Sequence, residues 1–116
     1  MSPTIVLKDG RPIMTLGAAG GPKIITQVVL TIIHHLDRSV DLWTALEQPR
    51  LHRQWSPNRL WVEKGFQQTV FEKLTSRHHD MSYLGSGGVC QAISLAANGN
   101  LLGASDPRVP GKTARF

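Results

Sequence analysis

Apolar positions recur with clear periods along most of the chain, and turn residues separate the periodic runs. Residues 4–17 predict a β-hairpin, because the runs TIVLK and PIMTLG flank Asp-Gly, a pair that tolerates the positive φ of tight hairpin turns. Residues 22–37 predict a helix, because apolar residues recur there every three or four positions and Pro22 suits the first helical turn. The pair Gly20 and Gly21 therefore falls in the turn between the two elements.

Shorter elements are expected in the rest of the chain. In order, they are a helix at 40–47 with Ser39 as its N-cap, two extended pieces around Ser56-Pro57-Asn58, a helix at 67–77, a strand at 81–84 and a flexible stretch at 85–88. A second hairpin is expected where VCQAISLAA and LLGAS flank Asn-Gly-Asn at 98–100. The order ββ-α-α-β-β-α-β-ββ predicts an antiparallel α+β fold with helices stacked on a sheet.

Composition favours one globular domain over residues 1–116, with 41% hydrophobic and 18% charged residues. The net charge is +5, but the cations are scattered, so they indicate either a solvated surface or an anion-binding patch. No apolar run reaches the roughly 18 residues of a membrane span, and MSPTIVLKDG lacks a signal-peptide pattern. The single cysteine, Cys90, excludes an intrachain disulfide. The compartment stays open.

Gly17, Gly20 and Gly21 are the first candidates for chemistry. A helix N-terminus gathers four unpaired N–H groups and the positive end of the helix dipole, which together stabilise an anion or an oxyanion. The absence of side chains lets a substrate approach the backbone closely. A plain strand-to-helix turn explains the same residues, and the spacing fits neither GxGxxG nor a Walker loop. Both interpretations remain open on the residues alone.

Other reactive side chains give weaker signals. His34 and His35, like His78 and His79, are adjacent and point about 100° apart on a helix, so capping or surface roles are favoured over metal ligation. No metal or cofactor is expected. Cys90 lies in an apolar strand and is interpreted as a small buried hydrophobe. Trp43, Trp55 and Trp61 suit core anchors, a docking place or, with the interleaved arginines, base stacking. The residues thus offer an oxyanion site but no attacking group.

Three motifs, in the right order and across the whole chain, resemble the small subunit of γ-glutamyltranspeptidases. MSPTIVLKDGRPIMTLGAAGGPKIIT resembles the family's S-S-M-S-P-T-I-v-…-D-G-…-G-S-P-G-G-…-I-I-T. QPRLHRQWSPNRLWVEKGF resembles A-P-R-F-H-H-Q-W-x-P-D-x-L-x-x-E. NGNLLGASDPRVPGKTARF resembles d-G-x-L-x-G-A-x-D-P-R-x-x-G-x-A-x-G-Y.

The resemblance implies an N-terminal-nucleophile hydrolase, with two sheets sandwiched between helix layers. A precursor would cut itself and free a threonine whose hydroxyl attacks the γ-glutamyl carbonyl, with its own amino group as the base. The acyl-enzyme would then pass to water, an amino acid or a peptide. Gly20 and Gly21 match the glycines that supply oxyanion-hole amides. Arg50 and Arg108 match arginines expected to support the site or a subunit contact, and Asp106 is expected to be a structural partner in its loop.

The chain departs from the family pattern at several positions. Ala18 and Ala19 replace Ser-Pro, Arg53 replaces a histidine and Phe116 replaces a tyrosine. The catalytic threonine and the serines that precede the motif's methionine, matched by Met1, are absent. We therefore expect the C-terminal segment of a small subunit, either an engineered truncation or a gene fragment. It would be inactive without the rest of the small subunit and the large subunit, and prone to self-association.

Two other functions remain open from the sequence. One is a non-catalytic homologue or protein-interaction module that keeps the fold, and the other is a small basic nucleic-acid binder that uses the Trp/Arg segment. The resemblance favours the enzyme, without nucleic acid as a partner and with a γ-glutamyl compound as substrate.

Overall fold

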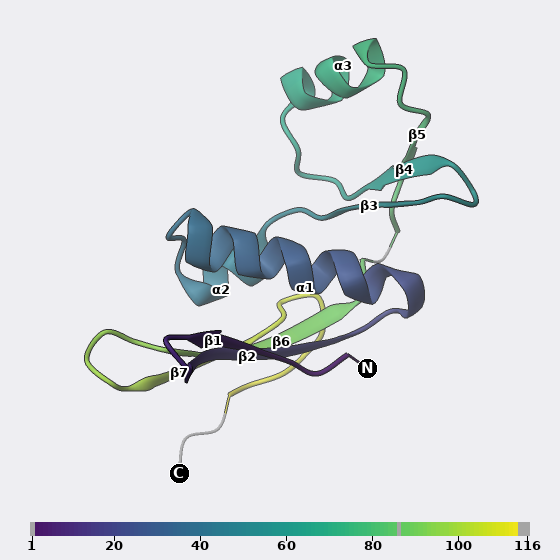
Figure 1. The fold of residues 1–116 in the computed structure, drawn as a ribbon. Coiled ribbons are helices and arrows are strands. Elements are labelled where there is room, and N and C mark those ends of the chain that lie inside the picture. Colours follow the sequence, from purple (N-terminus) through teal and green to yellow (C-terminus); the bar gives the residue numbers. More distant parts are fainter. Residues whose placement is uncertain (1, 86, 114–116) are drawn as a thin grey trace. The chain divides into compact units, whose positions relative to one another are not determined.

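The computed structural model describes residues 2–85 and 87–113, which form two compact units (Figure 1). The first unit holds the residues up to Gln48 together with those from Gly88 onward, and the second holds Pro49–Gly87. The expected single domain over residues 1–116 stays a prediction. Met1 and Phe116, two positions of the family comparison, lie outside the described residues, as does Ser86 of the stretch expected to be flexible.

A four-stranded antiparallel sheet forms the base of the first unit. Its strands lie in the order β1-β2-β6-β7. They span Thr4–Lys8 (β1), Arg11–Ala19 (β2), Val89–Leu95 (β6) and Leu101–Ser105 (β7). Both expected hairpins are confirmed, because β1 pairs with β2 across Asp9-Gly10 and β6 pairs with β7 across Gly99, all three with positive φ. β2 runs two residues past the expected hairpin and stays paired with β6 to its end, where Ala19 faces Val89.

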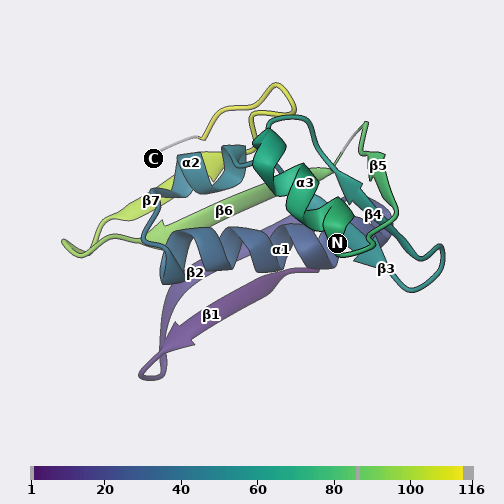
Figure 2. The ribbon, with the colours of Figure 1, turned by 90° about the horizontal axis from the view of Figure 1, so that it is seen from above.

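Helices cover one face of this sheet (Figures 1 and 2). The expected helix at 22–37 is three consecutive segments: a 3-10 turn at Gly21–Lys23, α1 at Ile24–Ile32 and a π-helical turn at Ile33–Asp37. The α2 helix follows at Leu42–Glu47. α1 packs on β2 and β6, and α2 packs on β6 and β7. The core lies between them and contains Met14, Leu16, Ala18, Val28, Leu42, Leu46, Cys90, Ala92 and Ala104. The expectation that Cys90 is buried is confirmed.

The N-cap expected for α2 is wrong. Asp41 directly precedes Leu42, and its carboxylate accepts a hydrogen bond from the Thr44 amide at 3.0 Å. Ser39 lies two residues too early and has φ 55, outside the extended range that an N-cap residue adopts.

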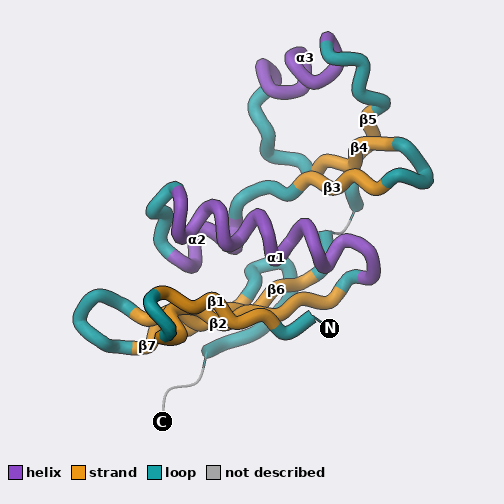
Figure 3. The backbone as a smooth tube through the Cα atoms, in the orientation of Figure 1, coloured by secondary structure: helices purple, strands orange, loops and turns teal. Residues whose placement is uncertain are grey.

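The second unit holds three strands and one helix (Figure 3). These are β3 (Leu51–Gln54), β4 (Arg59–Val62), α3 (Gln68–Ser76) and β5 (Met81–Tyr83). β3 and β4 form an antiparallel pair, whereas β5 runs parallel to β4. The parallel pairing follows from the connection, because α3 carries the chain back before β5 begins. The predicted element order is confirmed throughout.

Two of the three tryptophans are not core residues. Trp55 is 93% exposed, and Trp43 is 51% exposed. The expectation of a core anchor is therefore wrong for both. Within the described ranges, every helix is too short or too polar to cross a membrane.

Candidate active site

The candidate site is the junction between β2 and α1, in the first unit. β2 ends at Ala19, and the backbone then turns through Gly20, with φ 145, and Gly21, with φ 62. Both values favour glycine over residues with a side chain. Pro22 lies at the start of the 3-10 turn, directly after Gly21, where its fixed φ suits a helix start and its missing N–H loses no bond. The sequence therefore places two flexible residues and one rigid residue where the strand becomes a helix.

The backbone of this junction is open. Gly20 and Gly21 are exposed, and a Cβ built on Gly21 meets nothing within 4 Å. Gly20 is the N-cap residue, and as a glycine it has no side chain with which to cap this terminus. Among residues 2–85 and 87–113, none accepts a hydrogen bond from the amide of either glycine. Two N–H groups at the positive end of a helix dipole can stabilise a negatively charged oxygen.

Gln27, in the first turns of α1, is a neighbour that the sequence analysis missed. Its side chain is 1% exposed, and its Nε2 donates to the Ala19 carbonyl at 3.3 Å. Gly88, just before β6, lies against the same two groups, because a Cβ built there would collide with the Ala19 oxygen and with Gln27 Nε2. The one signal in the sequence is a polar residue within a largely apolar helix.

Asp106 and Arg108 form a separate cluster at the end of β7. Asp106 is fully buried, and its carboxylate accepts bonds from the Cys90 amide at 2.8 Å and the Arg108 amide at 3.0 Å. The Arg108 guanidinium lies 3.2 Å from the same carboxylate. It also donates to the carbonyls of Leu46 at 2.8 Å and Gln48 at 3.0 Å. The cluster therefore joins the end of α2 to β6 and β7.

Arg50 belongs to the second unit. It is 4% exposed, its amide donates to Glu63 Oε2 at 2.9 Å, and its carbonyl accepts from the Glu63 amide at 2.8 Å. His52, also buried, has its Nε2 3.0 Å from Gln54 Oε1. The supporting roles expected for Arg50, Arg108 and Asp106, and the oxyanion role of the two glycines, stay predictions.

The histidines are dispersed. Burial and the nearby Arg38 lower the pKa of His34 below its usual 6.5. His35 Nδ1 lies 2.8 Å from the Val40 carbonyl, and His79 Nδ1 lies 3.2 Å from the Arg53 guanidinium. In the part of the chain that the structure describes, no three His, Cys, Asp or Glu side chains come together as metal ligands.

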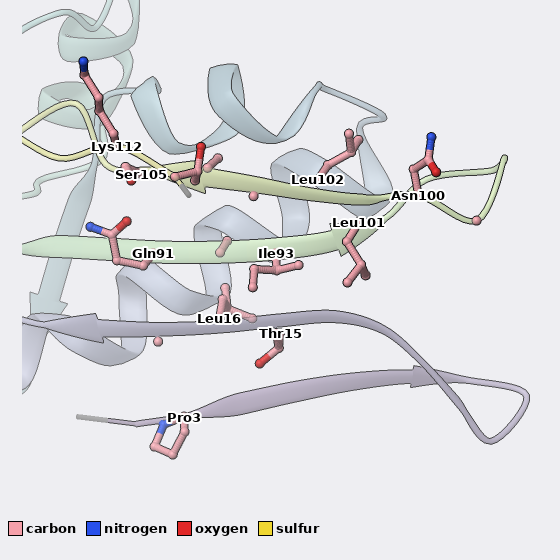
Figure 4. Close-up of a pocket in the computed structure, with 16 residues that line it drawn as sticks. Pro3, Thr15, Leu16, Gln91, Ile93, Asn100, Leu101, Leu102, Ser105 and Lys112 are labelled. Atoms are coloured by element: carbon pink, nitrogen blue, oxygen red, sulfur yellow. The ribbon is translucent and has the colours of Figure 1, made fainter. Parts of the chain in front are cut away.

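A broad hollow of about 950 Å³ lies elsewhere in the first unit (Figure 4). Residues of β2, β6 and β7 line it, and Gln91 and Ile93 do so from the exposed positions of β6. Gly20 and Gly21 are not among its lining residues. This hollow is thus distinct from the candidate site.

Comparisons with known proteins point to one family. A family model described as gamma-glutamyltranspeptidase matches residues 1–116. The glutathione hydrolase proenzyme of Escherichia coli is 39% identical over 108 residues, which cover 93% of this chain and 19% of that protein. The corresponding proenzyme of Bacillus subtilis is 36% identical over 109 residues, which cover 91% of this chain and 18% of that protein. The chain spans about a fifth of the length of these relatives.

Solved structures agree with the sequence matches. A γ-glutamyltranspeptidase mutant of Helicobacter pylori superposes with a TM-score of 0.87 and 34% identity, covering 94% of this chain and 61% of that chain. The γ-glutamyltranspeptidase of Pseudomonas nitroreducens superposes with a TM-score of 0.89 and 28% identity, covering 100% of this chain and 62% of that chain. The expected α+β fold, part of an N-terminal-nucleophile hydrolase, is confirmed by these likenesses.

Proposed function

We propose a function from one established premise, which is that the chain belongs to the gamma-glutamyltranspeptidase family. On this premise, the chain is part of an enzyme that takes the γ-glutamyl group from glutathione-like γ-glutamyl amides and passes it to water, an amino acid or a peptide. The observation that carries the proposal is the open pair of amides at Gly20 and Gly21, at the start of the 3-10 turn that leads into α1.

The two glycines would act when the γ-glutamyl carbonyl is attacked. A threonine hydroxyl adds to the carbonyl carbon, its proton passes to the threonine's own amino group, and the carbonyl oxygen becomes negatively charged. The amides of Gly20 and Gly21 donate hydrogen bonds to that oxygen and lower the barrier. Loss of one such donor typically raises the barrier by about 2.7–4 kcal/mol. Collapse of the intermediate expels the amine, which takes up the proton from the threonine's amino group, and leaves the acyl-enzyme.

The attacking threonine and the groups that hold the glutamate would lie on polypeptide outside these residues. The curated relatives are several times as long as this chain, which leaves room for both. The chain's partners are then the rest of the small subunit and the large subunit. Arg50, Arg108 and Asp106 would support the fold around the site without touching the substrate, which agrees with the main-chain bonds of Asp106 and Arg108.

Self-association of the isolated chain is part of the proposal. Ile5 and Leu7 of the edge strand β1 are 64% and 58% exposed, and Leu101 of the edge strand β7 is 73% exposed. Exposed apolar edge strands favour pairing with another chain. Light scattering of the purified chain should give a mass above 12.8 kDa that rises with concentration. A monomer at every concentration would contradict this expectation.

The activity test uses a chromogenic γ-glutamyl anilide. The full-length protein, meaning these residues with whatever polypeptide their gene encodes beyond them, should release the anilide above a heat-killed control. The 116-residue chain alone should not. Release of the anilide by the isolated chain would disprove its dependence on other polypeptide. No release by the full-length protein would favour a non-catalytic homologue.

A further inference from the structure

A buried glutamine side chain holds the peptide that carries one of the two candidate donors. Gln27 lies on α1, its side chain is 1% exposed, and its Nε2 donates to the Ala19 carbonyl oxygen at 3.3 Å. Ala19 is the last residue of β2, and the amide that follows its carbonyl is that of Gly20. The hydrogen bond therefore joins α1 to the peptide unit at the entrance of the candidate site.

The planar geometry of the peptide unit links this hydrogen bond to the direction of the Gly20 N–H group. The carbonyl of Ala19 and the N–H of Gly20 belong to one planar, trans peptide, so they point in opposite directions. A group that fixes the direction of the carbonyl also fixes the direction of the N–H. This control is needed here, because Gly20 at φ 145 lacks the steric limits that orient other residues.

The groups around the Gln27–Ala19 hydrogen bond restrict the movement of the Gln27 side chain. Ala19 pairs with Val89 in the sheet, and Gly88 next to it leaves no space for a side chain against the Ala19 oxygen and Gln27 Nε2. A side chain that is buried and held between a helix and a sheet has few alternative rotamers.

We propose that Gln27 is a positioning residue, which aims the Gly20 amide at the developing oxyanion by holding the Ala19 carbonyl. The proposal rests on the function proposed above, because it assigns Gln27 a task in that same site. Preorganised donors are effective because they are already aimed at the place where charge develops. Without the glutamine, the Ala19–Gly20 peptide loses one of the groups that hold its direction, and part of the donor's effect is lost.

The test compares three variants and has two measurements. Gln27→Met keeps a long side chain and removes the donor. Gly88→Ala places a methyl group against both the Ala19 oxygen and Gln27 Nε2, and so disturbs their bond without replacing Gln27. Thr31→Val is the matched control, because it removes a buried hydrogen bond on the same helix that does not involve Ala19. Each variant is made both in the chain and in the full-length protein.

The first measurement is the amide chemical shift of Gly20 in the labelled chain. A hydrogen bond at a carbonyl polarises the whole peptide unit, so the signal of Gly20 reports on the Ala19 bond. Gln27→Met and Gly88→Ala should both move this signal well beyond the change caused by Thr31→Val. An unmoved Gly20 signal in Gln27→Met overturns the inference, whatever the activity.

The second measurement is turnover of a γ-glutamyl anilide by the full-length protein. Gln27→Met should lower kcat about tenfold with KM unchanged, less than the roughly 10²–10³-fold loss expected when a donor is removed. Thr31→Val should leave kcat within about twofold of the parent. A moved Gly20 signal with unchanged kcat overturns the catalytic relevance of Gln27. If the unmutated protein has no turnover, the proposed function fails, and the inference fails with it as a statement about catalysis.

Discussion

The two helices of the first unit begin in opposite ways. α2 starts at Asp41, whose carboxylate accepts the Thr44 amide and satisfies the helix N-terminus from within the chain. The 3-10 turn that leads into α1 starts at Gly20-Gly21-Pro22, where the N-cap residue is a glycine without a side chain and the backbone is exposed. The first N–H groups of any helix lack partners within that helix. At α2 the Asp41 carboxylate accepts a bond from one of them, whereas the glycine before α1 has no side chain that could do so.

The C-terminal end of α2 is also bonded within the molecule. Arg108 donates to the carbonyls of Leu46 and Gln48, and it is held by the buried Asp106. α2 is thus bonded at both ends, although it has only six residues. A helix that is closed at both ends serves the fold, whereas an open N-terminus next to two glycines is available to a ligand. The comparison separates a structural helix start from a functional one.

The largest expected effect is on α2 and its anchor. Asp106→Ala leaves the Cys90 amide and the Arg108 guanidinium without a buried carboxylate, so the free energy of unfolding should fall by about 3–5 kcal/mol. Urea denaturation of the chain measures the loss. Asp106→Asn, which keeps an acceptor but not the charge, should lose less. A change under about 1 kcal/mol in Asp106→Ala would show that the cluster does not anchor α2.

Substitution at the open helix start should lower the activity more than the stability. Gly20→Ala places a Cβ on a residue with φ 145, so the backbone must shift and the donor is displaced. Turnover by the full-length protein should fall by about 10²–10³-fold. Gly99→Ala is the control, because Gly99 has φ 85 in a hairpin turn with open space around it. Equal turnover in the two variants would contradict a role for the α1 start.

Loss of the α2 cap should lower stability and leave activity unchanged. Asp41→Ala removes the bond to the Thr44 amide and should lower the free energy of unfolding, while Asp41→Asn keeps an acceptor and should lose less. Neither variant should change turnover beyond the effect of stability. The hydrogen bonds from Thr44 lower the pKa of Asp41 below 3.8, so the cap's contribution should be present above pH 3.8 and decline in more acidic solution. A stability loss in Asp41→Ala that is equal above and below that pH would contradict the cap.

The smallest expected effect lies beyond the other end of α1, in the π-helical turn. Burial and Arg38 lower the pKa of His34 below the unfolded value of 6.5. The unfolded chain therefore binds more protons in this range, and stability should decrease as pH falls through 6.5. His34→Gln should flatten this part of the stability–pH curve. An identical curve in the variant would show that His34 does not contribute.

The elements were predictable because their signals are local. Asp-Gly and Asn-Gly mark the two hairpins, and the apolar spacing marks α1. The cap of α2 was misplaced because Ser39 and Asp41 are both capping residue types two positions apart, and only the backbone at residue 39 separates them. The parallel β4–β5 pair depends on the path of the chain through α3, which no local pattern encodes.

Only part of the candidate site could be predicted from the sequence. The glycines, together with the family motif, indicate where an oxyanion would bind. Gln27 gives no such signal, because its partner at Ala19 is eight residues away and on another element. Arg108 reaches α2 across about sixty residues of sequence, so its carbonyl partners were equally hidden. Side-chain contacts between distant segments are what the folded structure adds.

The central claim is tested most directly by removing one N–H while the shape of the backbone is kept. Replacing Gly21 with glycolic acid in the full-length protein turns its amide into an ester, which keeps the shape of the backbone but has no donor. We expect kcat on a γ-glutamyl anilide to fall by about 10²–10³-fold while unfolding stability stays close to that of the parent. Turnover within about twofold of the parent, in a protein that is still folded, would contradict the claim that this amide stabilises the oxyanion.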